Sequence, residues 1–488
     1  MNKIKRWFNK TENTFSFKAY LPKTAHGLFL LIAIPVLVTI IIANPPMHGL
    51  DENSHLIRAY QLSRGKYYPE PHNRDTLPLE FEQFIEKNFP GPEHRFPFGM
   101  GGKAIVTSAS KEVPKVWTDV NTMSYPPLVY LPAAIGFRLA NVFYVPIGFS
   151  VWIAKLFQVS MYIGLIYIAL RFAKDASFRW VIFVVALLPM SLYSASTING
   201  DAYTNSVTLL FLSIVFTFML DKNRSKIDQR HLILFVSSAI LLSFTKTVYL
   251  IFLPLIFFVP GTIFLSQQRK ALSLKILLLV ICLLIGGAIY RVGLTAKYNP
   301  FLLMPAYANA SAGKQVQYME KRPVYVINTF TEDTINNFGN RLSSMINGFG
   351  EMSRLKSHID TSFFATFFGI SAIIAASTNS EKLKTRSKII AVGVIVCLIY
   401  GGIVLAMWLG NKIGTTSIQG VQGRYFIPLI FPVAVLLPKI KYFKVNLEKL
   451  IILLILLTIS LYMVEYLDKI ITTFVYMDQH NLLGVKQL

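Results

Sequence analysis

Long apolar runs, each able to cross a lipid bilayer, are the feature that most limits how this chain can fold. The run Leu28 to Ala43 is almost entirely Leu, Ile, Val and Ala. With its neighbours it is long enough to cross a hydrocarbon layer of about 30 Å at about 1.5 Å per residue. Over all 488 residues, 53% are hydrophobic and only 15% are charged, which indicates a polytopic membrane protein.

We therefore predict an all-α integral membrane protein, with residues 1–488 forming a single polytopic membrane domain. It should contain about 11 transmembrane helices, each read from an apolar run. The predicted spans are Leu28 to Ala43, Ile147 to Leu170, Trp180 to Ile198, Tyr203 to Leu220, His231 to Ser243, Tyr249 to Leu265, Leu274 to Tyr290, Phe363 to Ala376, Ile389 to Leu409, Tyr425 to Leu437 and Leu450 to Ile470.

The basic residues follow the topology of these spans. A net charge of +23 could indicate a nucleic-acid partner, but the Lys and Arg residues are spread over alternate loops rather than gathered on one soluble face. We therefore expect no nucleic acid. The segment Met1 to Lys23 is basic, and the positive-inside rule then places the N-terminus in the cytoplasm of a multi-pass cell-membrane protein. The first apolar run is too long for a cleavable signal and lacks a small-residue cleavage site.

This topology requires that the segment from Tyr125 to Phe143 does not cross the membrane. Its prolines and Arg138 favour a helix that lies at the interface. A large first extracytoplasmic loop, 45–146, then carries interfacial helices, and a second loop covers 291–362. The first loop holds ten of the 25 acidic residues, enough to form a working surface: Asp51, Glu52, Glu70, Asp75, Glu80, Glu82, Glu86, Glu93, Glu112 and Asp119.

The only cysteines, Cys282 and Cys397, lie inside separate predicted spans. We therefore expect neither a disulfide nor a thiolate metal site.

Four charged or ionisable residues come directly after the first span: Asp51, Glu52, His55 and Arg58. Asp51, His55 and Arg58 follow one another by four and three residues, so they share one face of a helix, with Glu52 about 100° round. A single acid here could simply cap the helix. Two acids, a His and an Arg in one short turn exceed what capping needs, and they indicate a site.

Further polar residues lie at the same predicted membrane boundary. Asp201 ends the segment Ser194 to Asp201, whose Asn-Gly-Asp sequence suits a tight turn as well as it suits a site. Lys155 and Lys246 fall within or near the ends of spans, where charge is costly and is functional by default, although snorkelling to lipid headgroups is an alternative for Lys246. Arg424 follows a loop rich in Gly and Gln, and its fork of donors suits a phosphate.

The order of these features resembles the GT-C superfamily of membrane glycosyltransferases. More closely, the chain resembles the bacterial DUF2142 family of membrane proteins, from Leu28 to about Pro438. Each motif is weak alone, and their order supplies the specificity. The motifs are Asp51-Glu52-x-x-His55-x-x-Arg58-Ala59-Tyr60, Tyr125-Pro126-Pro127-Leu128, Asn199-Gly200-Asp201 and Gln422-Gly423-Arg424-Tyr425-x-x-Pro428.

The GT-C resemblance implies transfer of a sugar from a polyprenyl-phosphate carrier to a cell-envelope glycan or related acceptor, on the outer face of the membrane. Asp51 would act as the base, and Glu52 would bind or orient the sugar or the acceptor. The expected substrate-binding residues are His55, Arg58, Tyr125, Lys155, Asn199, Asp201, Lys246, Gln422, Arg424 and Tyr425. Arg424 and Lys246 would hold the lipid phosphate, so no metal or other cofactor is required, although paired carboxylates also suit Mg²⁺ or Mn²⁺.

Two other functions remain open at this stage. A flippase or transporter of lipid-linked sugars would also use charge within the membrane, but it usually shows paired broken helices in repeated halves. A polysaccharide polymerase would act on a similar lipid-linked donor. Release of free carrier phosphate distinguishes transfer from transport.

Overall fold

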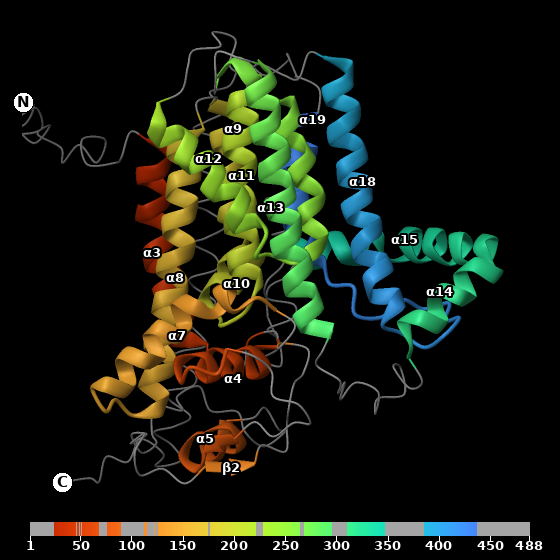
Figure 1. The fold of residues 1–488 in the computed structure, drawn as a ribbon. Helices are drawn as coiled ribbons and strands as arrows, with labels where there is room; N and C mark the ends of the chain where they lie inside the picture. The colour runs from red at the N-terminus through yellow and green to blue at the C-terminus, as the bar shows by residue number, and fades with distance from the viewer. Residues whose placement is uncertain are drawn as a thin grey trace, which may run out of the picture.

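Five long apolar helices form the frame of the protein. The computed structural model describes residues 24–44, 46–47, 49, 51–67, 76–88, 112–114, 122, 125–173, 176–220, 228–263, 268–294, 310–346 and 385–436. Within these ranges, five helices are long and apolar enough to cross a membrane. They are α3 (Ala25–Ala43), α8 (Ile147–Phe172), α11 (Asp201–Leu220), α13 (Gln268–Leu294) and α18 (Arg386–Leu409). They stand side by side in one bundle (Figure 1).

A sixth span is broken in the middle. The sequence predicts one continuous helix from Trp180 to Ile198, but the structure has α9 (Ala176–Ala186) and α10 (Pro189–Ser196), bent by 57°. Pro189 occupies the first turn of α10, where its missing N–H and fixed φ suit a new helix start but interrupt a continuing one. The predicted span therefore corresponds to two helices rather than one.

Three further predicted spans correspond to shorter apolar elements. These are α12 (Gln229–Leu242), the 3₁₀ helix η2 (Thr247–Phe258), and the 3₁₀ turn η5 (Gly423–Phe426) continued by α19 (Ile427–Leu436). The predicted spans 363–376 and 450–470 lie outside the described residues. The structure thus confirms an all-α membrane architecture with five or six candidate spans, and the count of eleven stays a prediction.

Short elements of the first predicted loop cover one end of the bundle. Helix α4 (Glu52–Ser63) lies across that end (Figure 1) and packs on α7 (Pro127–Val142), which in turn packs along α8. Beyond them, α5 (Leu79–Asn88) packs on two three-residue strands, β1 (Thr76–Pro78) and β2 (Glu112–Pro114). The strands pair antiparallel, with Leu77 opposite Val113, a small sheet that the sequence analysis did not predict.

The second predicted loop contains two helices, α14 (Ala312–Lys321) and α15 (Pro323–Ile346). Helix α15 projects sideways from the bundle rather than along it (Figure 1). The 3₁₀ turn η3 (Gly261–Ile263) precedes α13.

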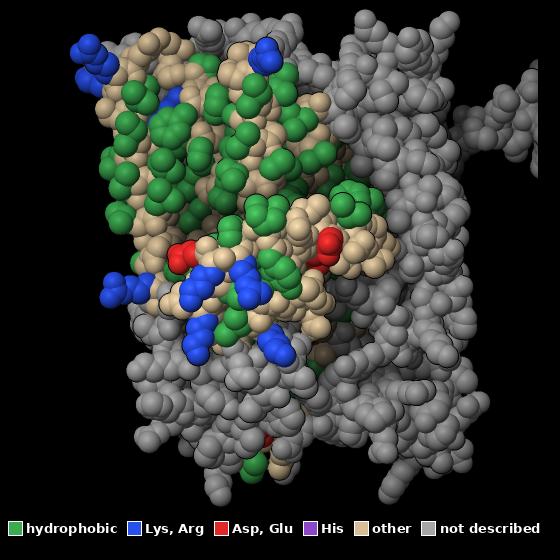
Figure 2. All heavy atoms as spheres, turned by 90° about the vertical axis from the view of Figure 1, so that its right-hand side faces the viewer, with side chains coloured by type: hydrophobic (Ala, Val, Ile, Leu, Met, Phe, Trp, Pro, Cys, Tyr) green, Lys and Arg blue, Asp and Glu red, His purple; other side chains and the backbone are tan. Residues whose placement is uncertain are grey.

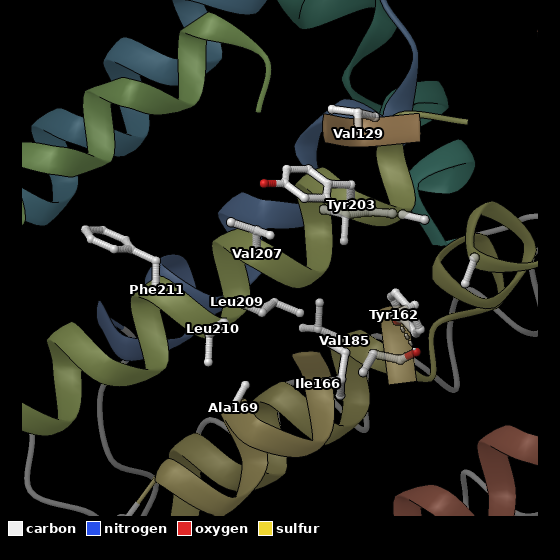
Figure 3. Close-up of a cluster of buried hydrophobic side chains, with 14 of the residues drawn as sticks. Val129, Tyr162, Ile166, Ala169, Val185, Tyr203, Val207, Leu209, Leu210 and Phe211 are labelled. Carbon is white, nitrogen blue, oxygen red and sulfur yellow. Dashed lines mark hydrogen bonds between the residues drawn. The ribbon is translucent and has the colours of Figure 1, made fainter. Parts of the chain in front are cut away.

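The core lies around α11, which contacts α8, α9, α10, α12 and α19. Nearly every residue of α11 is buried, and its side chains interlock with Ile166, Ala169 and Val185 of α8 and α9 (Figure 3). The Tyr162 hydroxyl donates to the Ala186 carbonyl at 2.7 Å, which satisfies a carbonyl at the end of α9.

The outer helices instead expose their apolar side chains. Leu277 and Leu284 of α13 are 56% and 67% exposed. Figure 2 shows such side chains covering the upper part of one face, with Lys and Arg side chains above and below them. An apolar band between basic margins is the surface expected of helices that face lipid.

Candidate functional site

The site begins at Asp51, directly before α4. This residue has a left-handed backbone (φ 55°, ψ 16°), and its side chain makes no capping hydrogen bond to the helix. Left-handed geometry is uncommon for a residue other than glycine and is tolerated best by Asp and Asn. The Asp51 side chain is 57% exposed, so the helix-cap alternative is wrong and the carboxylate is free to meet other groups.

Four charges from four separate segments meet at this end of the bundle, and we call them the charged cluster: Asp51, Asp201, Lys246 and Arg424. Arg424 lies between the two acids, with Nη2 2.6 Å from Asp51 Oδ2 and Nε 2.8 Å from Asp201 Oδ2. Lys246 Nζ lies 2.6 Å from Asp201 Oδ1. The cluster is neutral overall; Asp201 and Arg424 are buried, the Lys246 side chain is 19% exposed, and Asp51 is exposed.

Two tyrosines complete the surroundings of the cationic side. Lys246 Nζ lies 3.8 Å from the centre of the Tyr425 ring and 5.8 Å from that of Tyr125. These are cation–π distances. The Tyr249 hydroxyl donates to the Tyr425 carbonyl at 2.6 Å and fixes that residue in place. Burial raises the pKa of Tyr125 to about 12, so its hydroxyl remains protonated at neutral pH.

Asn199 positions Asp201 from within the loop between α10 and α11. Its Oδ1 accepts from the backbone N–H groups of Asp201 and Ala202, at 2.8 and 3.1 Å, and so caps α11. Its Nδ2 donates to the Ser194 carbonyl at 2.8 Å. The predicted turn is therefore present, and it places Asp201 in the charged cluster.

A second ion pair, the buried pair Glu52 and Lys155, lies behind the cluster. Lys155 Nζ is 2.9 Å from Glu52 Oε1, and both side chains are 0% exposed. The same carboxylate accepts from the N–H of Ile198 at 3.1 Å and from that of Gly49 at 3.0 Å. Glu52 therefore ties three segments together. Its predicted contact with sugar or acceptor does not fit this burial, and we revise its role to positioning Asp51.

His55 lies between the cluster and α7. Its Nδ1 is 2.6 Å from the Tyr130 hydroxyl, and its ring meets Tyr125 edge-on at 5.5 Å between centroids. Burial lowers the pKa of His55 to about 4, against an opposing influence of Asp51 and Asp201. His55 is thus a neutral, packed side chain at pH 7.

Arg58 lies away from the cluster. Its guanidinium donates to the carbonyls of Lys66 and Tyr67, at 3.0 and 2.8 Å, at the far end of α4. The expectation that Arg58 supports the acids does not fit these contacts, because Arg58 lies about two turns along the helix from Asp51 and its guanidinium binds carbonyls beyond the helix end. Arg58 instead fixes the exit of the chain from α4.

Gln422 caps η5 with its backbone, since its carbonyl accepts from the N–H of Tyr425 at 3.1 Å. Within the described part of the chain, its buried side-chain oxygen Oε1 has no hydrogen-bond partner. Because buried acceptors are normally hydrogen-bonded, this oxygen is suited to accept from a ligand or a water molecule.

Helix α15 holds the segment that carries Arg424. The Gly423 N–H donates to Ser344 Oγ at 3.2 Å. A Cβ added at Gly423 would lie 2.2 to 2.3 Å from Ser344 Oγ, the Arg341 carbonyl and the Met345 nitrogen. Glycine is thus required next to Arg424 by the close approach of another helix.

Several residues that support the site were not predicted from the sequence: Tyr130, Gln158, Tyr249 and Ser344. Gln158 donates to the Asn199 carbonyl at 2.7 Å and is fully buried. A signal for it was present, because it follows Lys155 by three residues on the same face of an apolar helix. The others are tyrosine and serine residues with no local pattern that marks them.

The charged cluster does not fit a divalent metal ion. Asp51 and Asp201 share the Arg424 guanidinium, and Asp201 also pairs with Lys246. Their negative charge is thus already balanced by the two cationic side chains. A divalent ion such as Mg²⁺ instead needs several oxygen ligands that are not paired with other cations. No group of three or more His, Cys, Asp or Glu residues able to hold a metal occurs in the described ranges.

A bundle of long, outwardly apolar helices, closed at one end around buried charge, defines an integral membrane protein. Within that class the chain belongs to the DUF2142 family of predicted membrane proteins, whose pattern matches residues 34–433. The family expected from the four motifs is thereby confirmed. No curated protein and no solved structure matches the chain.

Proposed function

We propose that the protein is a GT-C-type glycosyltransferase that moves a sugar from a polyprenyl-phosphate carrier to a cell-envelope glycan or related acceptor. One observation carries the proposal: the buried guanidinium of Arg424 is held between a buried acid, Asp201, and an exposed acid, Asp51. Arg424 would thus provide a cationic site for phosphate, and Asp51 is a carboxylate that could move away from that site.

The charge balance favours exchange of Asp51 for a phosphate. Two cations and two carboxylates neutralise each other in the cluster, so an added phosphate requires one acid to withdraw. Asp201 is held by both Arg424 and Lys246, whereas Asp51 makes one ion pair and is 57% exposed. Asp51 is therefore the acid that the donor phosphate displaces, and the planar Arg424 fork then binds two phosphate oxygens.

The displaced Asp51 carboxylate can act as the base. It takes the proton of an acceptor hydroxyl while the acceptor oxygen bonds to the anomeric carbon. The bond between that carbon and the phosphate oxygen breaks, and the polyprenyl phosphate leaves with the electron pair, stabilised by Arg424 and Lys246. The free Oε1 of Gln422 would accept from a sugar hydroxyl, and Tyr125 and Tyr425 would border the sugar. Glu52, Lys155, Asn199 and His55 would hold these groups in place.

The distribution of charge supports an extracytoplasmic site and a cytoplasmic N-terminus. Contacts of Phe172 with His231 and of Lys388 with the Met219 carbonyl bring the ends of α8 and α11 to the starts of α12 and α18. These ends lie opposite the cluster and carry basic residues: Arg171, Arg230, Arg386 and Lys388. The positive-inside rule places that end in the cytoplasm, in keeping with the proposed topology of about eleven spans.

Loss of the Asp51 carboxylate tests the proposal. The Asp51→Asn variant should lower transfer by about 10²–10⁴-fold while still binding donor lipid, because a general base contributes roughly that factor. The measurement is release of polyprenyl phosphate from an undecaprenyl-phosphate sugar by purified protein with cell-envelope acceptor. Glu320→Gln, at an exposed acid of α14, is the matched control and should turn over like the parent. Near-normal transfer by Asp51→Asn would remove Asp51 as the base.

The broken span α9–α10 favours a second candidate, a flippase of lipid-linked sugars. Its 57° bend leads directly into the loop before Asp201, and discontinuous helices at a binding site are typical of transporters. Movement of intact donor lipid across reconstituted vesicles, without release of carrier phosphate, would support this candidate against the transferase.

A further inference from the structure

Helix α15 is divided lengthwise into three faces. One face is buried against the rest of the protein, and its members are Val326, Thr329, Asp333 and Arg341. On this face Arg341 pairs with Asp333 and donates from Nη1 to the Tyr400 hydroxyl at 3.0 Å. The charges of Arg341 and Asp333 on the buried face are thus paired with each other.

A second face is apolar and exposed. Its members are Val324 (69% exposed), Ile327 (64%), Ile335 (71%), Phe338 (56%) and Leu342 (43%). At about 100° per residue, these five positions fall within an arc of about 80° along the whole helix. Five large apolar side chains in one row are more than scattered surface residues explain.

A third face is polar and exposed, and it borders the apolar one. Its members follow one another by four residues: Asn328, Glu332, Asn336 and Asn340. A spacing of four keeps successive members adjacent, and the row turns by about 40° a step from the edge of the apolar face at Asn328 to the edge of the buried face at Asn340. The helix therefore presents one face suited to protein, one to an apolar medium and one to water.

We propose that α15 lies in the interface between membrane and water at the end of the bundle that carries the charged cluster. Its apolar face, from Val324 to Leu342, contacts lipid acyl chains, and its polar face contacts water. A helix in this setting runs parallel to the membrane plane, and α15 projects sideways from the spanning helices (Figure 1).

Two observations identify lipid as the occupant of the apolar face. Helix α18, on which α15 packs through Tyr400 and Trp408, exposes its own apolar residues Val394 and Leu398, 50% and 55% exposed. Basic residues gather at the start of α15 and beside it: Lys314, Lys321, Arg322 and Lys412 are all exposed. Figure 2 shows Lys and Arg side chains grouped below the apolar side chains on this side, where they meet phosphate headgroups.

Spin labels on the two exposed faces test the proposal in the full chain reconstituted in phospholipid nanodiscs. The background carries Cys397→Ser, and Cys282 is fully buried, so the background alone should take up no label. Single cysteines are introduced as Ile335→Cys and Phe338→Cys on the apolar face, and as Glu332→Cys and Asn336→Cys on the polar face. Leu398→Cys in α18 serves as the lipid-facing reference.

Labels at 335 and 338 should collide with oxygen more than with a water-soluble nickel chelate, as at 398, and labels at 332 and 336 should show the reverse. Equal access of the nickel chelate to both faces would place α15 in water and overturn the proposal. Exclusion of both reagents from 335 and 338 would show a protein partner on the face and would also overturn it. If either apolar-face variant fails to fold, Leu342→Cys and Asn340→Cys make the same comparison.

Discussion

The buried pair Glu52 and Lys155 shows what a single residue contributes at this site. Both side chains are completely buried, and the carboxylate also accepts two backbone N–H groups. Removing one member of such a pair leaves the other charge without compensation, which costs about 3–5 kcal/mol. The pair thus acts by holding the backbone of Gly49, beside Asp51, against Ile198.

Lys155→Met should lower the free energy of unfolding by about 3–5 kcal/mol, because the Glu52 charge loses its partner in a dry environment. Addition of Glu52→Gln should restore part of the loss, because it removes the uncompensated charge while its amide oxygen can still accept from one of the two N–H groups. Thermal unfolding in detergent measures both variants, and Lys412→Met, at an exposed lysine, is the control. If Lys155→Met alone were as stable as the parent, water would have to reach the Glu52 carboxylate.

His55 makes the stability depend on pH in the acidic range. Its pKa is about 4 in the folded protein because of burial, against 6.5 ordinarily. Between these values the unfolded state binds more protons, so the free energy of unfolding should fall as the pH drops from 6.5 towards 4, by about 3 kcal/mol in total.

Unfolding of the parent and of His55→Asn across this range measures the effect, and the variant should show a weaker pH dependence. Asn336→Ala, at an exposed side chain that does not titrate, should keep the parental slope. Identical slopes for the parent and His55→Asn would mean that folding does not lower the pKa of His55.

At the scale of elements, the contact between α15 and η5 determines where Arg424 lies. The Gly423 Cα faces the α15 backbone at a distance that leaves no room for a side chain. From the sequence we predicted the span that follows Arg424 and noted the glycines before it, but we predicted a loop for 291–362. An amphipathic helix with three faces was missed because its apolar residues are diluted by polar ones.

Gly423→Ala should push η5 away from α15, because added atoms in a packed contact force backbone shifts. The free energy of unfolding should fall by at least about 1–3 kcal/mol, and donor-lipid binding should weaken as well. Gly339→Ala in the middle of α15 meets nothing within 4 Å and should be neutral or stabilising by about 0.5–1 kcal/mol. Thermal unfolding and lipid binding of the two variants should therefore diverge. If the two variants had the same stability and lipid binding, α15 would be able to shift away from η5 without loss of stability.

At the scale of the whole molecule, the cluster and the basic helix ends occupy opposite ends of the bundle. Glu320 of α14 and Gln268 at the start of α13 are both exposed. In a Cys397→Ser background, Glu320→Cys should react with a membrane-impermeant thiol reagent on intact cells, and Gln268→Cys should react only after the cells are opened. The reverse labelling pattern would invert the proposed orientation.

The sequence alone determined that this is a membrane protein, the approximate positions of the spans that lie in the described ranges, and the four residues that meet in the charged cluster. Apolar length and basic loops are local properties of the chain, and costly charges at a membrane boundary are visible without a structure. The motifs also identified the family. What they could not give was the break between α9 and α10 or the three faces of α15, since both depend on the neighbours against which each helix packs.

Only the tertiary structure decided the roles of the two adjacent acids. Asp51 and Glu52 are neighbours of nearly the same chemistry, yet one is exposed against Arg424 and the other is buried against Lys155. Asp51 and Arg424 are 373 positions apart in the chain. The choice of partner follows from the left-handed backbone at Asp51 and from the packing of α4 on α7 at this end of the bundle, and no local pattern encodes packing between segments distant in sequence.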